Sequence, residues 1–123
     1  NHESPRRGSN FVKNKVVKAA VRIKLGLQTE LELGNLDAYR DWGHSKDYIR
    51  AMHLILQQPE AGDWVVATGE TRSVRDMCKY VFSKLELNYE DYVVQNKKFL
   101  RPEELKYLKG DSTRIRCNIS PYK

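Results

Sequence analysis

Residues 64–85 read WVVATGETRSVRDMCKYVFSKL, and this stretch decides the fold class. Residues 64–68 form a continuous apolar run that stops at a glycine, a pattern typical of a strand buried on both faces of a sheet. Ser73 and Asp76 have the spacing of a reciprocal N-terminal cap, and apolar residues then recur with the helical period to the end of the stretch. A buried strand that leads into an amphipathic helix predicts an α/β fold with some parallel strand pairing.

The sequence on both sides of this stretch predicts more helices and short strands. Apolar residues at helical spacing predict a helix over residues 11–25, with Ser9 or Asn10 as its N-cap. The other expected elements are helices over residues 45–57 and 112–118, strands over residues 29–33 and 92–94, and a loop over residues 101–111. Two to four short strands make a thin sheet, so we expect the buried strand at 64–68 to belong to a larger sheet that is partly missing.

The composition is that of one ordinary domain. The chain has 123 residues, of which 40% are hydrophobic and 31% charged, so we expect a single domain over residues 1–123 with a sizeable core. No apolar run approaches the roughly 20 residues that span a bilayer, which excludes a membrane-spanning segment. The polar start at Asn1 resembles neither an initiator nor a signal peptide, so we expect it to be a cut end. Two cysteines are too few for a disulfide-stapled scaffold, so a cytoplasmic, reducing setting is expected.

The net charge of +6 is concentrated towards the two ends of the chain. Residues 1–30 carry +5, residues 31–96 carry −4 and residues 97–123 carry +5. Such an uneven balance indicates an anionic partner, either a nucleic acid or a smaller phosphate-bearing ligand. A solvated lysine-rich surface explains the charge alone equally well.

Metal-binding and dinucleotide-binding patterns are missing from the sequence. His2, His44, His53, Cys78 and Cys117 are scattered rather than clustered, so no metal site is expected. The seven glycines never approach the spacing GxGxxG or GxxxxGK of phosphate-binding loops. Cys78 lies on the apolar stripe of its helix, so we expect it in the core.

One pair of residues has the spacing of a catalytic motif. Tyr80 and Lys84 form Tyr-x-x-x-Lys, in which an ammonium beside a phenol can support base chemistry. Together with Asp76, however, they lie four residues apart and off the apolar stripe of the helix. We therefore expect an exposed polar row and not a site.

The arginines of the loops are better candidates for binding. Residues 6–7, Arg40 and Arg101 lie in loops or directly before a predicted helix or proline, where a planar guanidinium can fork onto phosphate oxygens. Each of them taken singly could instead be a surface charge or a structural salt bridge. Asp41 is placed near enough in sequence to orient His44.

Several motifs in a fixed order closely resemble the GDP-mannose 4,6-dehydratases, a family of extended short-chain dehydrogenases. The resemblance covers nearly the entire chain, and its two most specific segments are NHESPRRG at residues 1–8 and RDWGH at residues 40–44. The other matches are FV at residues 11–12 with Lys15, LGNLDA at residues 33–38, KDY at residues 46–48, ATG at residues 67–69, SVR at residues 73–75, RPEE at residues 101–104 and GDST at residues 110–113.

The resemblance implies a two-domain enzyme with an N-terminal Rossmann domain for NADP and a smaller C-terminal domain for the GDP-sugar. Such an enzyme converts GDP-mannose to GDP-4-dehydro-6-deoxymannose and water through a transient 4-keto intermediate. The present chain is then expected to be the C-terminal, GDP-sugar-binding portion, with few short strands and three to four helices. Its Rossmann domain, glycine-rich loop and catalytic Thr, Glu, Tyr and Lys lie upstream of NHESPRRG, so no catalytic residue is expected here and the chain alone should be inactive.

The resemblance also implies roles for particular residues. Arg40 and Arg101 are expected to clamp the diphosphate of GDP-mannose, and Glu104 to hold a ribose hydroxyl. The other residues expected to contact the sugar nucleotide are Asn1, Val12 and Lys15, with Gly34 and Asn35 at its guanine end. His2 and Arg7 are expected to contact NADP, and the loop at residues 6–7 to join subunits of a homo-oligomer, a dimer or tetramer.

Two other functions are compatible with the sequence. The first is a basic nucleic-acid-binding module that presents the helix at residues 11–25 to phosphates. The second is a GDP-sugar-binding interaction subunit that does not catalyse. The dehydratase hypothesis, by contrast, predicts GDP-mannose as the partner and neither nucleic acid nor membrane.

Overall fold

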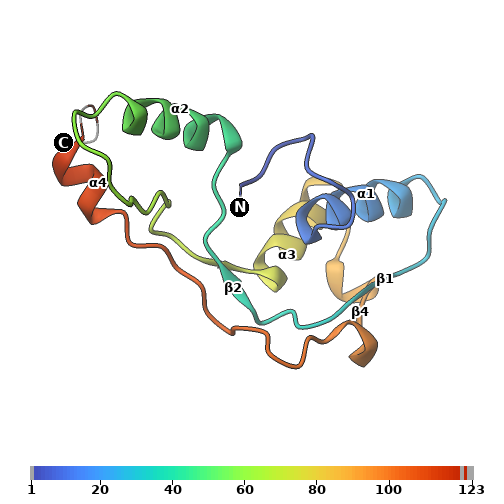
Figure 1. Ribbon diagram of the computed structural model, residues 1–123. Helices are drawn as coiled ribbons and strands as arrows, with labels where there is room; N and C mark the ends of the chain where they lie inside the picture. Colours follow the sequence, from blue (N-terminus) through green and yellow to red (C-terminus); the bar gives the residue numbers. More distant parts are fainter. Residues whose placement is uncertain (1, 120, 122–123) are drawn as a thin grey trace.

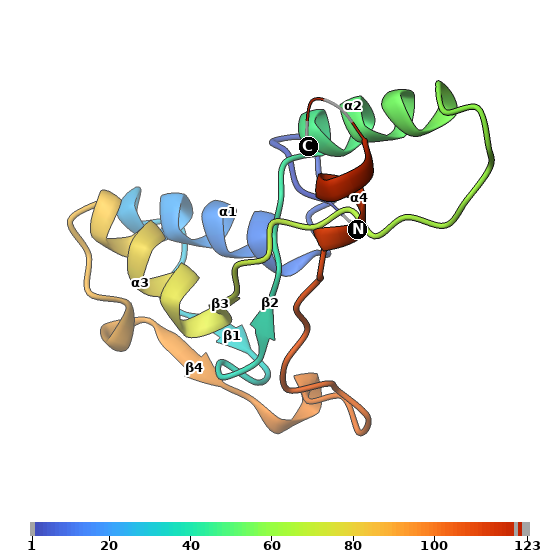
Figure 2. The same cartoon turned by 90° about the vertical axis from the view of Figure 1, so that its left-hand side faces the viewer.

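The computed structural model describes residues 2–119 and 121, and its elements form two groups joined by a short antiparallel ribbon (Figures 1 and 2). In one group α1 and α3 pack beside the parallel strands β1 and β4, and in the other α2 lies next to α4. The helices are α1 (Val12–Lys24), α2 (Ser45–Leu56), α3 (Val74–Lys84) and α4 (Thr113–Asn118), with 3-10 turns η1 (Tyr89–Asp91) and η2 (Lys97–Phe99). The strands are β1 (Leu31–Leu33), β2 (Tyr39–Arg40), β3 (Arg72–Ser73) and β4 (Val93–Gln95).

The strand pairing confirms an α/β fold with parallel pairing. β1 and β4 pair in parallel, with Leu31 opposite Val93 and Leu33 opposite Gln95, whereas β2 and β3 pair antiparallel. The helices and strands predicted from periodicity are confirmed to within a few residues, and the segment at 101–111 is irregular as predicted.

The predicted strand at residues 64–68 is wrong. This segment is irregular, and within the described part of the chain none of the backbone N–H groups of residues 64–67 donates to another backbone group. A β-strand forms only where a neighbouring strand takes up its N–H and C=O groups, and the described residues place no strand beside this one. The apolar run therefore has the composition of a buried strand without the partner that would make it one.

The helix caps were only partly predictable. Phe11, and not Ser9 or Asn10, is the N-cap of α1, and it makes no side-chain cap. The reciprocal cap of α3 is confirmed: Ser73 Oγ accepts from the Asp76 N–H at 3.0 Å, and Asp76 Oδ2 accepts from the Ser73 N–H at 3.1 Å. Hydrogen bonding of the Asp76 carboxyl to the Ser73 backbone N–H, and to the Ser73 side chain, holds the pKa of this carboxyl below its ordinary value.

Replacement of Ser73 by alanine is expected to lower the free energy of unfolding by about 1 kcal/mol, because the Asp76 N–H loses its acceptor. Urea denaturation followed by circular dichroism measures this change. Ser83→Ala is the matched control: the exposed Ser83 hydroxyl donates only to the Tyr80 carbonyl of its own helix, so its removal should change stability by less than about 0.5 kcal/mol. Equal losses in the two variants would contradict a role for the cap.

The hydrophobic core consists of two clusters, one in each group of elements. The larger fills the space between α1, α3 and β1, and the fully buried Phe82 lies in it with its ring stacked 6.1 Å from that of Tyr92. Cys78 is also fully buried there, as predicted, and burial raises the pKa of its thiol to about 11. The smaller cluster is made by Ala51, Ile115 and Ile119.

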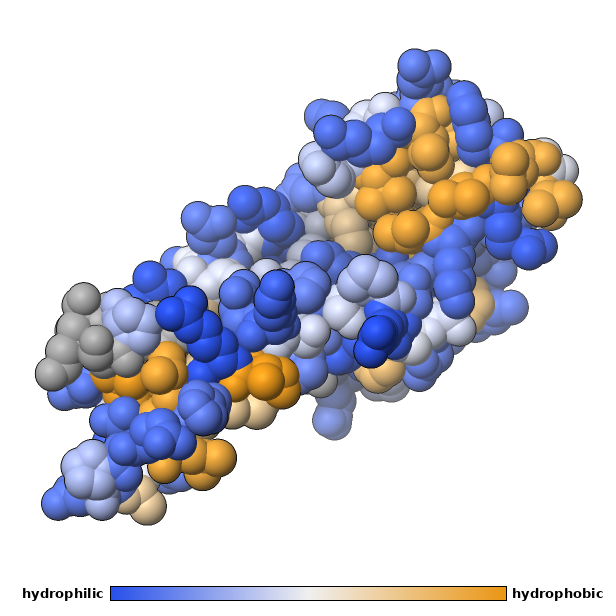
Figure 3. Space-filling model, turned by 90° about the horizontal axis from the view of Figure 1, so that it is seen from above, coloured by the Kyte–Doolittle hydropathy of each residue, from blue (hydrophilic) through white to orange (hydrophobic). Residues whose placement is uncertain are grey.

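Much apolar surface is left uncovered at both ends of the molecule (Figure 3). Leu56 at the end of α2 is 81% exposed, Leu25 after α1 is 67% exposed, and Val65 in the irregular apolar run is 54% exposed. Apolar patches of this kind mark surfaces that contact other protein. Among the described residues, no helix has the length and apolarity needed to cross a membrane.

Candidate functional site

A cleft with a volume of about 640 Å³ lies between the N-terminal loop, the start of α1, the ends of β1 and β2, and the segment that follows β4. We call this segment, residues 97–110, the strap; it runs from the end of β4 towards α4 (Figure 2). Its residues 98–102 and 104 form one wall of the cleft. The volume lies within the range of pockets that take small-molecule ligands.

The structure brings together almost all the residues that the sequence singled out. The substrate-contact candidates that line the cleft are Val12, Lys15, Gly34, Asn35, Arg40, Arg101 and Glu104, and Arg7 lines it as well. His2 does not: its ring stacks 5.6 Å from that of Tyr48, and its carbonyl accepts from Arg7 Nη1 at 2.7 Å. Asn1 lies outside the described residues.

The cleft carries more positive than negative charge. Its basic side chains are Arg7, Lys15, Arg40, Lys98 and Arg101, and its acidic side chains are Glu3, Asp41 and Glu104. Aromatic rings lie among them, with Lys15 Nζ 4.4 Å from the centre of the Phe99 ring and the Arg7 guanidinium 3.7 Å above that of Phe11. Such an arrangement suits an anionic ligand with a flat ring.

Arg40 is held in place by bonds to the strap. Its Nη2 lies 3.3 Å from Glu104 Oε1, and its Nη1 donates to the carbonyl oxygens of Leu105 and Tyr39, both at 2.7 Å. The side chains of Arg40 and Glu104 are 23% and 22% exposed, so this ion pair is better shielded from water than the other ion pairs of the described residues. The strap therefore holds the guanidinium at the cleft before any ligand arrives.

Gly34 is placed where no side chain fits. A Cβ at this position would lie 2.5 Å from the Phe99 carbonyl oxygen, so the end of β1 and the strap can approach each other only through a glycine. The neighbouring Asn35 uses its Oδ1 to accept from the Asp37 N–H at 2.9 Å, which shapes the turn.

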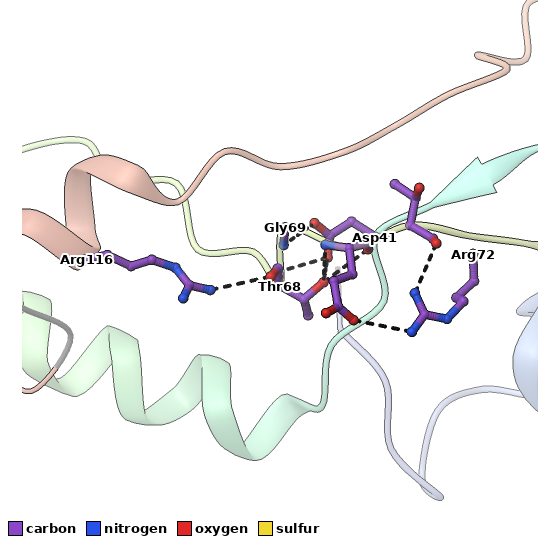
Figure 4. A network of polar contacts seen from close by, with 7 residues as sticks. Asp41, Thr68, Gly69, Arg72 and Arg116 are labelled. Carbon is purple, nitrogen blue, oxygen red and sulfur yellow. Dashed lines mark hydrogen bonds and ion pairs between the residues drawn. The ribbon is translucent and has the colours of Figure 1, made fainter.

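Asp41 does not orient His44, contrary to the sequence-based expectation. Its carboxylate accepts from Thr68 and Gly69 (Figure 4) and also from Gly110, while His44 Nδ1 accepts from the Lys46 N–H and so caps α2. Burial would raise the pKa of the Asp41 carboxyl, but the hydrogen bonds outweigh it and the pKa is lowered.

Other cleft residues were not recognised from the sequence. Trp42, Lys98 and Phe99 line the cleft, and the only signal near the last two was the basic pair at residues 97–98. Tyr80 and Lys84 are exposed on α3, which confirms the predicted polar row. Among residues 2–119 and 121, no three His, Cys, Asp or Glu side chains gather closely enough to hold a metal ion.

Two polar atoms of the cleft residues are buried without a hydrogen-bond partner in the described part of the chain: Glu3 Oε2 and Arg7 Nε. Burying such atoms unpaired is unfavourable by roughly 1–3 kcal/mol each.

The fold is that of the C-terminal portion of an extended short-chain dehydrogenase. The structure of RMD from Pseudomonas aeruginosa complexed with NADPH matches 95% of this chain with a TM-score of 0.82 and 26% sequence identity, through 38% of its own chain. The model of the family described as GDP-mannose 4,6 dehydratase matches residues 1–120, and the chain belongs to this family.

Relatives agree with this membership. GDP-mannose 4,6 dehydratase 1 of Arabidopsis thaliana is 49% identical over 116 residues, which are 94% of this chain and 32% of the relative. The GDP-mannose 4,6 dehydratase of Homo sapiens is 41% identical over an alignment of 137 positions, which covers 98% of this chain and 37% of the relative. The chain thus spans about a third of the length of the curated relatives it matches, in their C-terminal part.

Proposed function

We propose that this chain is the GDP-sugar-binding part of a GDP-mannose 4,6-dehydratase, an NADP-dependent lyase that converts GDP-mannose to GDP-4-dehydro-6-deoxymannose and water. The observation that carries the proposal is the cleft, because Arg40 and Arg101 line it together with Lys15 and the ring of Phe99. Two guanidinium groups in a sheltered cleft can each fork onto the oxygens of a diphosphate with charge-assisted hydrogen bonds. Family membership supports the proposal that this diphosphate belongs to a GDP-sugar.

We propose the following contacts with the ligand. Arg40 and Arg101 clamp the diphosphate, and Glu104, next to Arg40, takes a ribose hydroxyl. Gly34 and Asn35 line the guanine end. Val12 and Lys15 of α1 contact the nucleotide, as does Asn1.

NADP is proposed to be bound mainly outside this chain. The chain has no glycine-rich dinucleotide loop, and Arg7 is already engaged with the His2 carbonyl and the Phe11 ring. We propose that a Rossmann domain elsewhere in the enzyme binds NADP and supplies the catalytic residues. Hydride transfer is the chemistry that NADP would contribute.

That domain would also cover surface that the chain leaves open. The irregular apolar run at 64–68 has free backbone groups with which a strand of that domain could pair. The same domain or a ligand could supply hydrogen-bond partners for the unpaired Glu3 Oε2 and Arg7 Nε. Chain 1–123 is thus proposed to be one domain of a larger protein.

We further propose a homo-oligomer joined at the exposed loop of Arg6, and a cytoplasmic setting, which rests on the two free cysteines.

Titration calorimetry with GDP tests the binding function directly. We expect GDP to bind at least about tenfold more tightly than GMP, because GMP lacks the second phosphate and with it a charge-assisted bond to Arg40 or Arg101. Duplex DNA serves as the competing anion, and added GDP-mannose with NADP should give no turnover by the chain alone.

Three results would overturn parts of this proposal. Equal affinities for GDP and GMP would contradict the proposed diphosphate clamp. Turnover by the isolated chain would mean that the catalytic residues lie in this chain. Tight binding of DNA at physiological salt, with GDP failing to compete, would favour the nucleic-acid-binding function instead.

A further inference from the structure

The Asp41 carboxylate joins three parts of the chain that lie far apart in sequence, and Figure 4 shows its contacts with one of them, the loop at 68–69. Its Oδ1 accepts from the N–H of Thr68 at 3.0 Å and from the hydroxyl of Thr68 at 2.5 Å. Its Oδ2 accepts from the N–H of Gly69 at 3.0 Å and from the N–H of Gly110 at 3.2 Å. One side chain at the end of β2 thus fastens the loop at 68–69 and the end of the strap to each other.

These bonds leave Asp41 little capacity to contact a ligand. A carboxylate has about four lone-pair positions, and four donors already occupy those of Asp41. The negative charge of the Asp41 carboxylate would also repel a diphosphate. Asp41 itself lines the cleft, but Thr68, Gly69 and Gly110, whose groups it binds, do not.

The strap depends on β2 and Asp41 for its position against the cleft. Tyr39 pairs with the strap through two backbone hydrogen bonds: its N–H donates to the Lys106 carbonyl at 2.8 Å, and its carbonyl accepts from the Leu108 N–H at 3.0 Å. The Arg40 side chain donates to the Leu105 carbonyl. Asp41 binds the end of the strap at the Gly110 N–H, and the same carboxylate oxygen also binds the Gly69 N–H in the loop at 68–69.

The packing at this attachment is tight. A Cβ on Gly110 would lie 2.2 Å from the Cβ of Ala67, so the end of the strap and the loop that Asp41 joins are in direct contact. The loop is tied onward to α4, because Arg116 Nη2 donates to the Thr68 carbonyl at 3.4 Å and its Nε donates to Ser112 Oγ at 2.7 Å.

We propose that Asp41 is a positioning residue of the cleft, whose carboxylate fastens the strap so that Arg101 and Glu104 face Arg40 in the geometry that receives the diphosphate. The proposal rests on the GDP-binding function proposed above. It assigns to the aspartate of RDWGH the task of fixing the wall of the site, while the neighbouring arginine contacts the ligand.

The test compares Asp41→Asn with Asp47→Asn in the full 123-residue chain. Asparagine keeps one acceptor oxygen but turns an NH₂ group towards the N–H donors of Gly69 and Gly110 or of Thr68, so at least one of these bonds is lost. Asp47 is exposed in the first turn of α2 and serves as the matched loss of one negative charge. Amide hydrogen exchange measures the strap and titration calorimetry measures the affinity for GDP.

We expect Asp41→Asn to speed amide exchange across the strap by about tenfold or more, with α1 and α3 unchanged, and to weaken GDP binding by about tenfold or more. Asp47→Asn should change both quantities less than about twofold. Gly110→Ala keeps the carboxylate but forces the strap away from Ala67, so it should reproduce both effects. This second variant also decides the matter if Asp41→Asn fails to fold.

An unchanged strap in Asp41→Asn would overturn the proposal, and so would a loosened strap with unchanged affinity for GDP. If the unaltered chain binds no GDP, the proposed function fails, and the exchange data still show whether Asp41 fastens the strap. The two failures are therefore distinguishable.

Discussion

Replacement of Phe82 by alanine is expected to lower the free energy of unfolding by about 3–5 kcal/mol. The side chain is fully buried between α1, α3 and β1, and its ring stacks on Tyr92, so its removal loses contacts on every side and leaves a cavity. Domains have total stabilities of roughly 5–15 kcal/mol, so a substantial part of the margin would be lost. Thermal melting followed by circular dichroism should show the midpoint falling by about 10 °C or more.

Tyr80→Ala is the matched control for this loss. Tyr80 lies two residues earlier on the same helix, is also aromatic and is 63% exposed, so its replacement should change stability by less than about 0.5 kcal/mol. Similar destabilisation by the two variants would mean that aromatic content and not burial sets the stability of α3, contrary to the position of Phe82 in the core.

The parts of the fold that were predictable from the sequence are those that local interactions determine. α3 is marked by its apolar period and by a cap whose two partners, Ser73 and Asp76, are three residues apart. The apolar run at 64–68 was predicted wrongly because strand formation depends on a neighbour that composition does not reveal. α1 begins at a phenylalanine N-cap, so the cap residues before it gave the wrong start.

The site, like the fold, was predictable from the sequence only in part. Motifs placed Arg40 and Glu104 in one binding site, but not the ion pair between them, because 64 residues separate the two in sequence. Asp41 was assigned to His44, three residues away, whereas its actual partners Thr68 and Gly110 are 27 and 69 residues distant. Sequence patterns identify which groups can bind an anion, and the tertiary structure decides which of them bind one another.

Replacement of Arg40 by alanine is expected to weaken GDP binding by roughly 10- to 150-fold, since each hydrogen bond to a charged group contributes about 1.5–3 kcal/mol. The guanidinium is 23% exposed at the cleft and is held there by Glu104 and the Leu105 carbonyl, so little order remains to be gained on binding. Titration calorimetry with GDP measures the loss. Arg72→Ala is the control, because Arg72 makes an ion pair of the same 3.3 Å length with Glu70 but is 60% exposed and does not line the cleft.

Two mechanisms could produce that loss, and a double variant separates them. Arg40→Ala removes a contact to the diphosphate, but it also leaves the Glu104 carboxylate unpaired beside the ligand, where it would repel phosphate oxygens. Glu104→Gln removes the second effect while nearly keeping the shape of the side chain. If Arg40 itself contacts the diphosphate, affinity for GDP stays at least about tenfold weaker in the double variant than in Glu104→Gln alone. Full recovery of affinity would assign to Arg40 only the neutralisation of Glu104, and the diphosphate clamp would then have to be built from Arg101 and Lys15.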